Sequence, residues 1–86
     1  MAVTADVTLA GGWEVGYTST ADGTNVIVTP QGKGINWAVR NDTTPPAESL
    51  KGHKMDSPWD RQFIVPDGET LFFRGAAGAV VSVTVT

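Results

Sequence analysis

The side chains that could act as a general base or a nucleophile gather around a single histidine. His53 is the only histidine of the chain, and Ser49, Asp56 and Ser57 lie within four residues of it. A catalytic triad needs a base that is held by an orienting partner beside the nucleophile. All four residues fall in one stretch without helical or strand periodicity, so no rigid element is predicted to hold that geometry. We therefore expect His53 to lie at a surface or an interface, and we expect that the protein is not an enzyme.

Metal ligands and paired carboxylates are equally sparse. With one histidine and no cysteine, the common zinc ligand sets are excluded. Asp56, Asp60 and Asp67 do not have the spacing of an EF-hand, and they are better explained as turn formers or solvated charges. The three glutamates fall in a predicted strand, loop and turn, so nothing places two of them across a cleft. The glycine-rich runs 32–34 and 75–78 do not precede a predicted helix, so we expect them to be turns rather than phosphate-binding loops. We expect no metal and no cofactor.

Length and charge narrow the class of protein further. Eighty-six residues fit a single domain, 1–86, and the absence of cysteine leaves it without disulfides. The absence of disulfides in so small a domain favours assembly in a reducing cytoplasm, or stability gained from partner subunits. The net charge is −3 and the six Lys and Arg residues are scattered, so we expect neither nucleic acid nor membrane as a partner. The first nine residues lack the pattern of a signal peptide, and no apolar run reaches the length of a membrane span.

The elements that must position any site are strands. Val and Thr alternate through much of the chain, and turn signals such as Asp22-Gly23 and Asp67-Gly68 separate the alternating segments. Seven strands are predicted, at residues 3–9, 13–18, 25–29, 35–40, 61–65, 71–74 and 79–86. Short, evenly spaced and mostly antiparallel strands of this kind are typical of an all-β domain. The sequence leaves open whether the domain is a small β-sandwich or a β-barrel.

Three apolar features indicate what these strands bury. Trp37, between Ile35 and Val39, is predicted to anchor the core, and Trp13 is expected to be half-buried at the start of its strand. Three consecutive β-branched residues, 26–28, suggest a strand that is covered at least partly on both faces.

The stretch from Asn41 to Trp59 is predicted to be a long irregular loop, with at most one helical turn near residues 47–51. Loops of this length in small domains are usually functional or are held by a partner. Trp59 either pins its own loop to the core or contacts a partner, since tryptophan is enriched in interaction hot spots. The expected partner-binding residues are Pro45, Pro46, His53, Met55 and Trp59.

The terminal strands offer a second surface. Residues 3–9 and 79–86 contain neither proline nor lysine, which commonly guard a sheet edge against pairing with another chain. Either these two strands pair with each other, or an edge is used to build an oligomer.

The second half of the chain resembles a known type of protein. The run 37–40 is followed by Pro45-Pro46, by residues 51–55, by Ile64 to Arg74 with its Asp-Gly-Glu turn, and by a final Val/Thr strand. Over residues 35–86 this looks like the small β-proteins encoded in the structural gene clusters of tailed bacteriophages. Those are head decoration or cement proteins and domains of fibres or spikes. The resemblance implies a structural binding role in symmetric oligomers with many copies per particle.

The sequence therefore leads to two hypotheses. The first is a non-enzymatic phage virion protein, assembled in the host cytoplasm, that decorates or cements the capsid through protein–protein contacts. Its expected partners are the major capsid protein or other virion proteins, and a second copy of itself in a dimer or trimer. The second is a carbohydrate- or receptor-binding module of a tail fibre or spike, with Trp13, Tyr17 and Trp59 as its platform.

Overall fold

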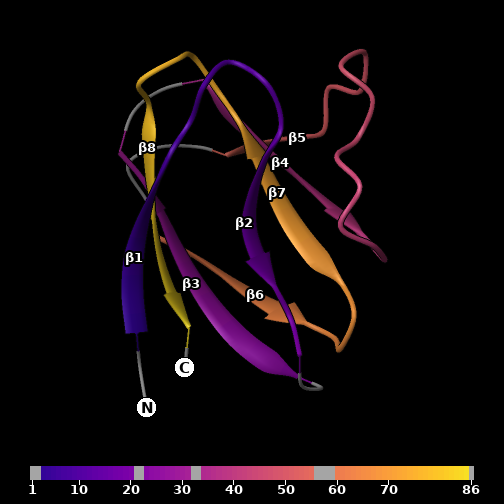
Figure 1. Cartoon of the computed structure of the whole chain (residues 1–86). Coiled ribbons are helices and arrows are strands. Elements are labelled where there is room, and N and C mark those ends of the chain that lie inside the picture. Colours follow the sequence, from indigo (N-terminus) through magenta and orange to yellow (C-terminus); the bar gives the residue numbers. More distant parts are fainter. Residues whose placement is uncertain (1–2, 21–22, 32–33, 56–59, 86) are drawn as a thin grey trace.

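The chain folds into two four-stranded antiparallel sheets that pack face to face (Figure 1). The computed structural model describes residues 3–20, 23–31, 34–55 and 60–85. Its strands are β1 (Val3–Thr8), β2 (Glu14–Thr18), β3 (Thr24–Pro30), β4 (Ile35–Arg40), β5 (His53–Met55), β6 (Arg61–Val65), β7 (Thr70–Arg74) and β8 (Val80–Val85). This confirms the all-β class, and the two separate sheets make it a sandwich.

The strands pair mainly with partners that are distant in sequence. Sheet A has the order β1-β8-β3-β6 and sheet B the order β2-β7-β4-β5. Every connection between described strands crosses to the other sheet, except the one from β4 to β5. The terminal strands pair with each other, from Val3 opposite Val85 to Thr8 opposite Val80, so β8 is an inner strand and β1 is an edge.

The core fills the space between the sheets. Because side chains alternate along a strand, every second residue of each sheet points into this space. The buried cluster consists of Leu9, Val26, Val28, Ile35, Met55, Val65, Leu71, Phe73, Val81 and Val83. Trp37 packs against this cluster, as expected of a core anchor, although its ring is only partly buried.

Three local expectations need correction. A short eighth strand, β5, lies inside the stretch predicted to be irregular, because residues 53–55 pair with β4. Trp13 is buried, at 6% exposure, rather than half-buried. Within the run 26–28, Val26 and Val28 are buried, but Ile27 lies on the outer face of sheet A and is 38% exposed.

Candidate functional site

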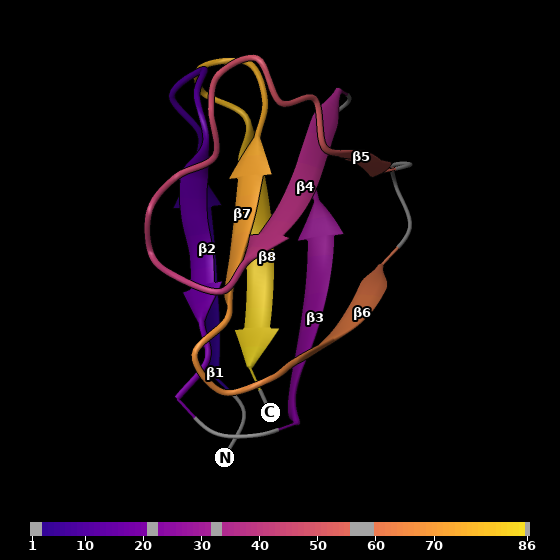
Figure 2. The same ribbon diagram turned by 90° about the vertical axis from the view of Figure 1, so that its right-hand side faces the viewer.

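The first part of the predicted loop crosses the outer face of sheet B. Residues 41–52, which we call the cover loop, pass over β2, β7 and β4 (Figure 2). A small second core lies on this face, made of Trp13, Ala38 and the fully buried Phe72. The sandwich therefore has a third layer, because Phe72 points away from the main core and is nevertheless shielded from water.

Two polar side chains on the outer face of sheet B hold the second half of the cover loop. Arg74 Nη1 donates to the backbone oxygens of Glu48, at 2.5 Å, and Leu50, at 3.2 Å. Asn36 Nδ2 donates to the backbone oxygen of Lys51, at 2.7 Å. Asn36 and Arg74 are direct neighbours across β4 and β7, so one cross-strand pair holds three backbone carbonyl groups within residues 48–51 of the loop.

Arg74 also joins the loop to the second core. Its Cζ lies 5.9 Å from the centroid of the Trp13 ring, within the range of a cation–π contact. Its Nη2 lies 3.4 Å from Glu48 Oε2, an ion pair that contributes little because the Glu48 side chain is largely exposed. The hydrogen bonds to the loop backbone and the contact with Trp13 are therefore the main functions of this guanidinium group.

Replacing Arg74 with lysine is expected to release the cover loop. Lysine keeps the charge but not the planar fork that reaches two carbonyl groups, and hydrogen bonds to charged groups contribute about 1.5–3 kcal/mol each. We expect faster amide hydrogen exchange across residues 44–52 and a lower denaturant midpoint. Arg40→Lys is the control, because Arg40 bonds an exposed carboxylate at 3.4 Å and should change stability by less than about 0.5 kcal/mol. Unchanged exchange in the Arg74 variant would contradict the assignment.

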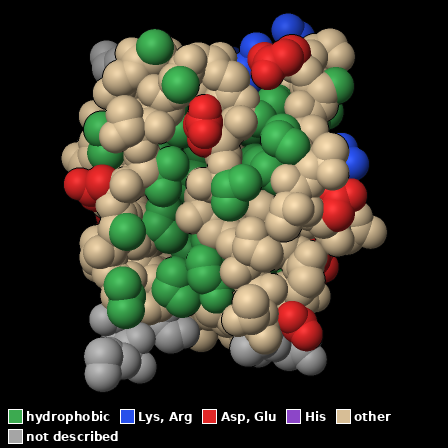
Figure 3. Space-filling view, viewed as in Figure 1, with side chains coloured by type: hydrophobic (Ala, Val, Ile, Leu, Met, Phe, Trp, Pro, Cys, Tyr) green, Lys and Arg blue, Asp and Glu red, His purple; other side chains and the backbone are tan. Residues whose placement is uncertain are grey.

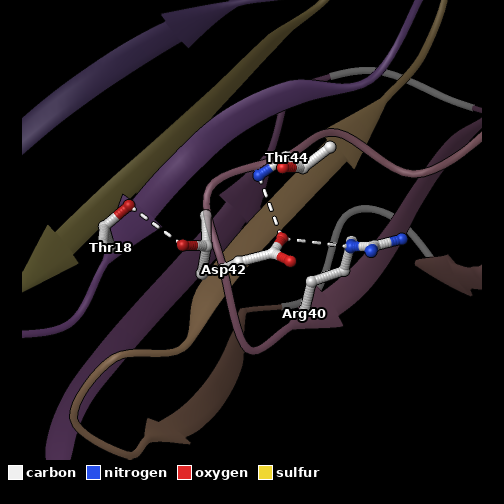
Figure 4. Close-up of polar contacts among 5 residues, drawn as sticks. Thr18, Arg40, Asp42 and Thr44 are labelled. Carbon is white, nitrogen blue, oxygen red and sulfur yellow. Dashed lines mark hydrogen bonds and ion pairs between the residues drawn. The ribbon is translucent and has the colours of Figure 1, made fainter.

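The first half of the cover loop is held by local contacts. Asp42 accepts a hydrogen bond from the backbone N–H of Thr44, at 3.0 Å, and pairs with Arg40 Nε at 3.4 Å (Figure 4). Nearby, the hydroxyl groups of Thr18 and Thr70 are hydrogen bonded at 3.1 Å, which links β2 to β7. This end of the loop is an Asp-stabilised turn.

A depression lies where the cover loop meets β4, β5 and β7. It has a volume of about 450 Å³. Its lining residues are Asn36, Glu48, Ser49, Lys51, Gly52, Lys54 and Arg74. Six of the seven lining residues have polar or charged side chains, and three of these are cationic, so the depression can accept an anionic group. Sequence reasoning did not find it, because the docking of the loop brings these residues together.

The structure separates the five residues that were predicted to bind a partner. Pro45 and His53 are exposed, whereas Pro46 is buried. Met55 is 4% exposed and belongs to the main core, since it pairs with Ile35 on β4 and shares its inward direction. Trp59 lies outside the described residues. Partner contact therefore remains a prediction for Pro45 and His53, while Met55 has a packing role.

His53 is part of an aromatic group at the β5–β6 side of the sandwich. Its ring centroid lies 4.6 Å from that of Trp37, and Phe63 meets the same indole edge-on at 4.8 Å. Arg61 Cζ lies 5.9 Å from the Trp37 ring. Of the glycan platform suggested from sequence, Trp13 is buried, Tyr17 is half-buried against the main core, and Trp59 lies outside the described residues.

The opposite side of the sandwich is apolar and open. Hydrophobic side chains form a band between the edge strands β1 and β2 (Figure 3). Val3 is 61% exposed and Ala5 is exposed, although strand alternation places both on the inward face of sheet A with Val7. Sheet B does not cover this end of β1.

Two classes of site lack support in the described part of the chain. No group of three or more His, Asp or Glu side chains there is placed to hold a metal ion. Nor does any helix in the described residues have the length and apolar character needed to cross a bilayer. Asp60, one of the candidate calcium ligands, accepts a hydrogen bond from the Thr29 hydroxyl at 2.5 Å.

The fold and the site together define an all-β sandwich whose outer face carries a docked loop and a cationic depression. Comparison of the chain with protein-family models, with curated proteins and with solved structures finds no match.

Proposed function

We propose that this protein is a non-enzymatic structural component of a tailed-phage particle that attaches to the capsid through protein–protein contacts. The resemblance of residues 35–86 to phage structural β-proteins suggests the particle. The fold is compatible with it, because a small sandwich without disulfides gains stability from a symmetric interface.

The observation that carries the proposal is the open edge at β1. An edge strand presents unpaired backbone N–H and C=O groups that can pair with another chain. Here the edge adjoins exposed apolar side chains, Val3 and Ala5, and no lysine or proline of β1 guards it. Such a surface favours burial against a second copy or a capsid subunit.

Quantitative mass spectrometry of purified particles tests the proposal directly. Hundreds of copies per particle would support a decoration or cement role. A handful would move the protein to the tail or a fibre and overturn the capsid assignment. Absence from intact particles would overturn the virion role altogether.

Replacing Ala5 with lysine is expected to abolish self-association and to weaken attachment to particles that lack the protein by more than about tenfold. Burying an unpaired ammonium group at an interface costs at least a few kcal/mol. Ile64→Lys is the matched control, because Ile64 is 68% exposed on the other edge strand of sheet A. Light scattering and co-sedimentation measure the two effects. Equal losses for both variants, or none for either, would contradict a role for the β1 edge.

A further inference from the structure

We infer that the depression beside the cover loop binds the carboxylate groups of an acidic segment on a protein partner. Three of the six cationic residues of the chain line it, together with one of the nine acidic residues. The depression thus carries a formal charge of +2, and the remainder of the chain carries −5. This local reversal of charge is the first argument for an anionic ligand.

The hydrogen-bond donors that line the depression come from sheet B and from the cover loop. Lys54 lies on β5, Arg74 lies on β7, and Lys51 and Ser49 belong to the cover loop. Lys51 and Lys54 are exposed, and the described structure contains no ion pair within 4.0 Å for either ammonium group. Arg74 is already occupied by the loop backbone and Glu48, so the two lysines and the Ser49 hydroxyl are the groups that would meet a ligand.

The charge of the rest of the chain decides the size of the anion. A long polyanion such as a nucleic acid would extend from the depression over a surface of net charge −5 and would be repelled there. A short anionic group gains the local attraction without that repulsion. The ligand is therefore confined to roughly the extent of the depression.

The exposure of the site favours side chains of a protein over a free small anion. At an open surface, a single ion pair contributes only about 0.2–1 kcal/mol, so a free anion gains little. Carboxylates carried by a partner arrive together with other contacts, and Leu50, exposed between Ser49 and Lys51, offers an apolar one. This inference rests on the proposed protein–protein function, since it names the chemistry of the partner.

The test is an NMR titration of the full chain with hexaglutamate, hexaglutamine and inorganic phosphate. We expect saturable shifts from hexaglutamate at the amides of residues 48–54, no response to hexaglutamine, and weakening as salt rises. Lys51→Gln combined with Lys54→Gln should lower the affinity roughly five- to tenfold. Arg40→Gln combined with Arg61→Gln removes the same charge elsewhere and should leave the affinity within about twofold.

Each other outcome overturns the inference. Absence of saturable shifts, or equal losses in the two double variants, would show that no specific site exists. Tighter binding of phosphate than of hexaglutamate would reassign the depression to phosphate groups. The titration does not depend on the abundance of the protein in particles. It therefore tests this inference separately from the virion role.

Discussion

Replacing Phe72 with alanine is expected to lower the free energy of unfolding by about 3–5 kcal/mol, although Phe72 points away from the main core. Its side chain is fully buried between β7 and the cover loop, in contact with Trp13 and Ala38. Truncation would leave a cavity on the face that the cover loop crosses. For a domain of this size the loss is a large part of the total stability.

Chemical denaturation of the Phe72 variant, followed by far-ultraviolet circular dichroism, measures this cost. Ile64→Ala is the control, because Ile64 also lies on an outer face but is 68% exposed, and its truncation should cost less than about 0.5 kcal/mol. A cost below about 1 kcal/mol for Phe72→Ala would mean that the cover loop does not shield this face in solution.

The architecture could be predicted from sequence to the level of strands but not of their partners. Period-two alternation identified seven segments because each strand has one inward and one outward face. It says nothing about neighbours, and nearly all pairings here join strands distant in sequence, such as β1 with β8. The eighth strand was missed because His53-Lys54-Met55 is too short to show a period, and its pairing with β4 alone defines it.

A run of consecutive apolar residues does indicate the strand that lies beneath the third layer, but the prediction chose a different run. Coverage of both faces, at least in part, was predicted for residues 26–28, where Ile27 proves to be 38% exposed. The run Leu71-Phe72-Phe73 has the same character and is buried on both faces, because the cover loop lies over Phe72. The run alone could not identify its cover, since the hydrogen bonds from Asn36 and Arg74 that fix the loop depend on the folded sheet.

Replacing Gly52 with alanine is expected to cost about 3 kcal/mol and to displace the cover loop. Gly52 has φ +70°, a region that costs other residues about 1–2 kcal/mol. A Cβ there would also lie 2.6 Å from Trp13 Cη2 and 2.6 Å from the Trp37 carbonyl oxygen. Such overpacking adds about 1–3 kcal/mol. Denaturant unfolding measures the total.

Gly23→Ala isolates the backbone contribution, because Gly23 has φ +68° and no atom within 4 Å of the added Cβ. We expect the Gly23 variant to lose only about 1–2 kcal/mol, and equal losses at both sites would contradict the close approach of the loop to Trp13. Combining Gly52→Ala with Trp13→Leu separates the two contributions to the steric cost, the clash with the Trp13 ring and the clash with the Trp37 carbonyl oxygen. The smaller side chain removes the clash with the indole, but the Trp37 carbonyl belongs to the backbone of β4 and cannot yield. The double variant should therefore recover part of the contact cost and not all of it, since β4 fixes the distance between the loop and the sheet.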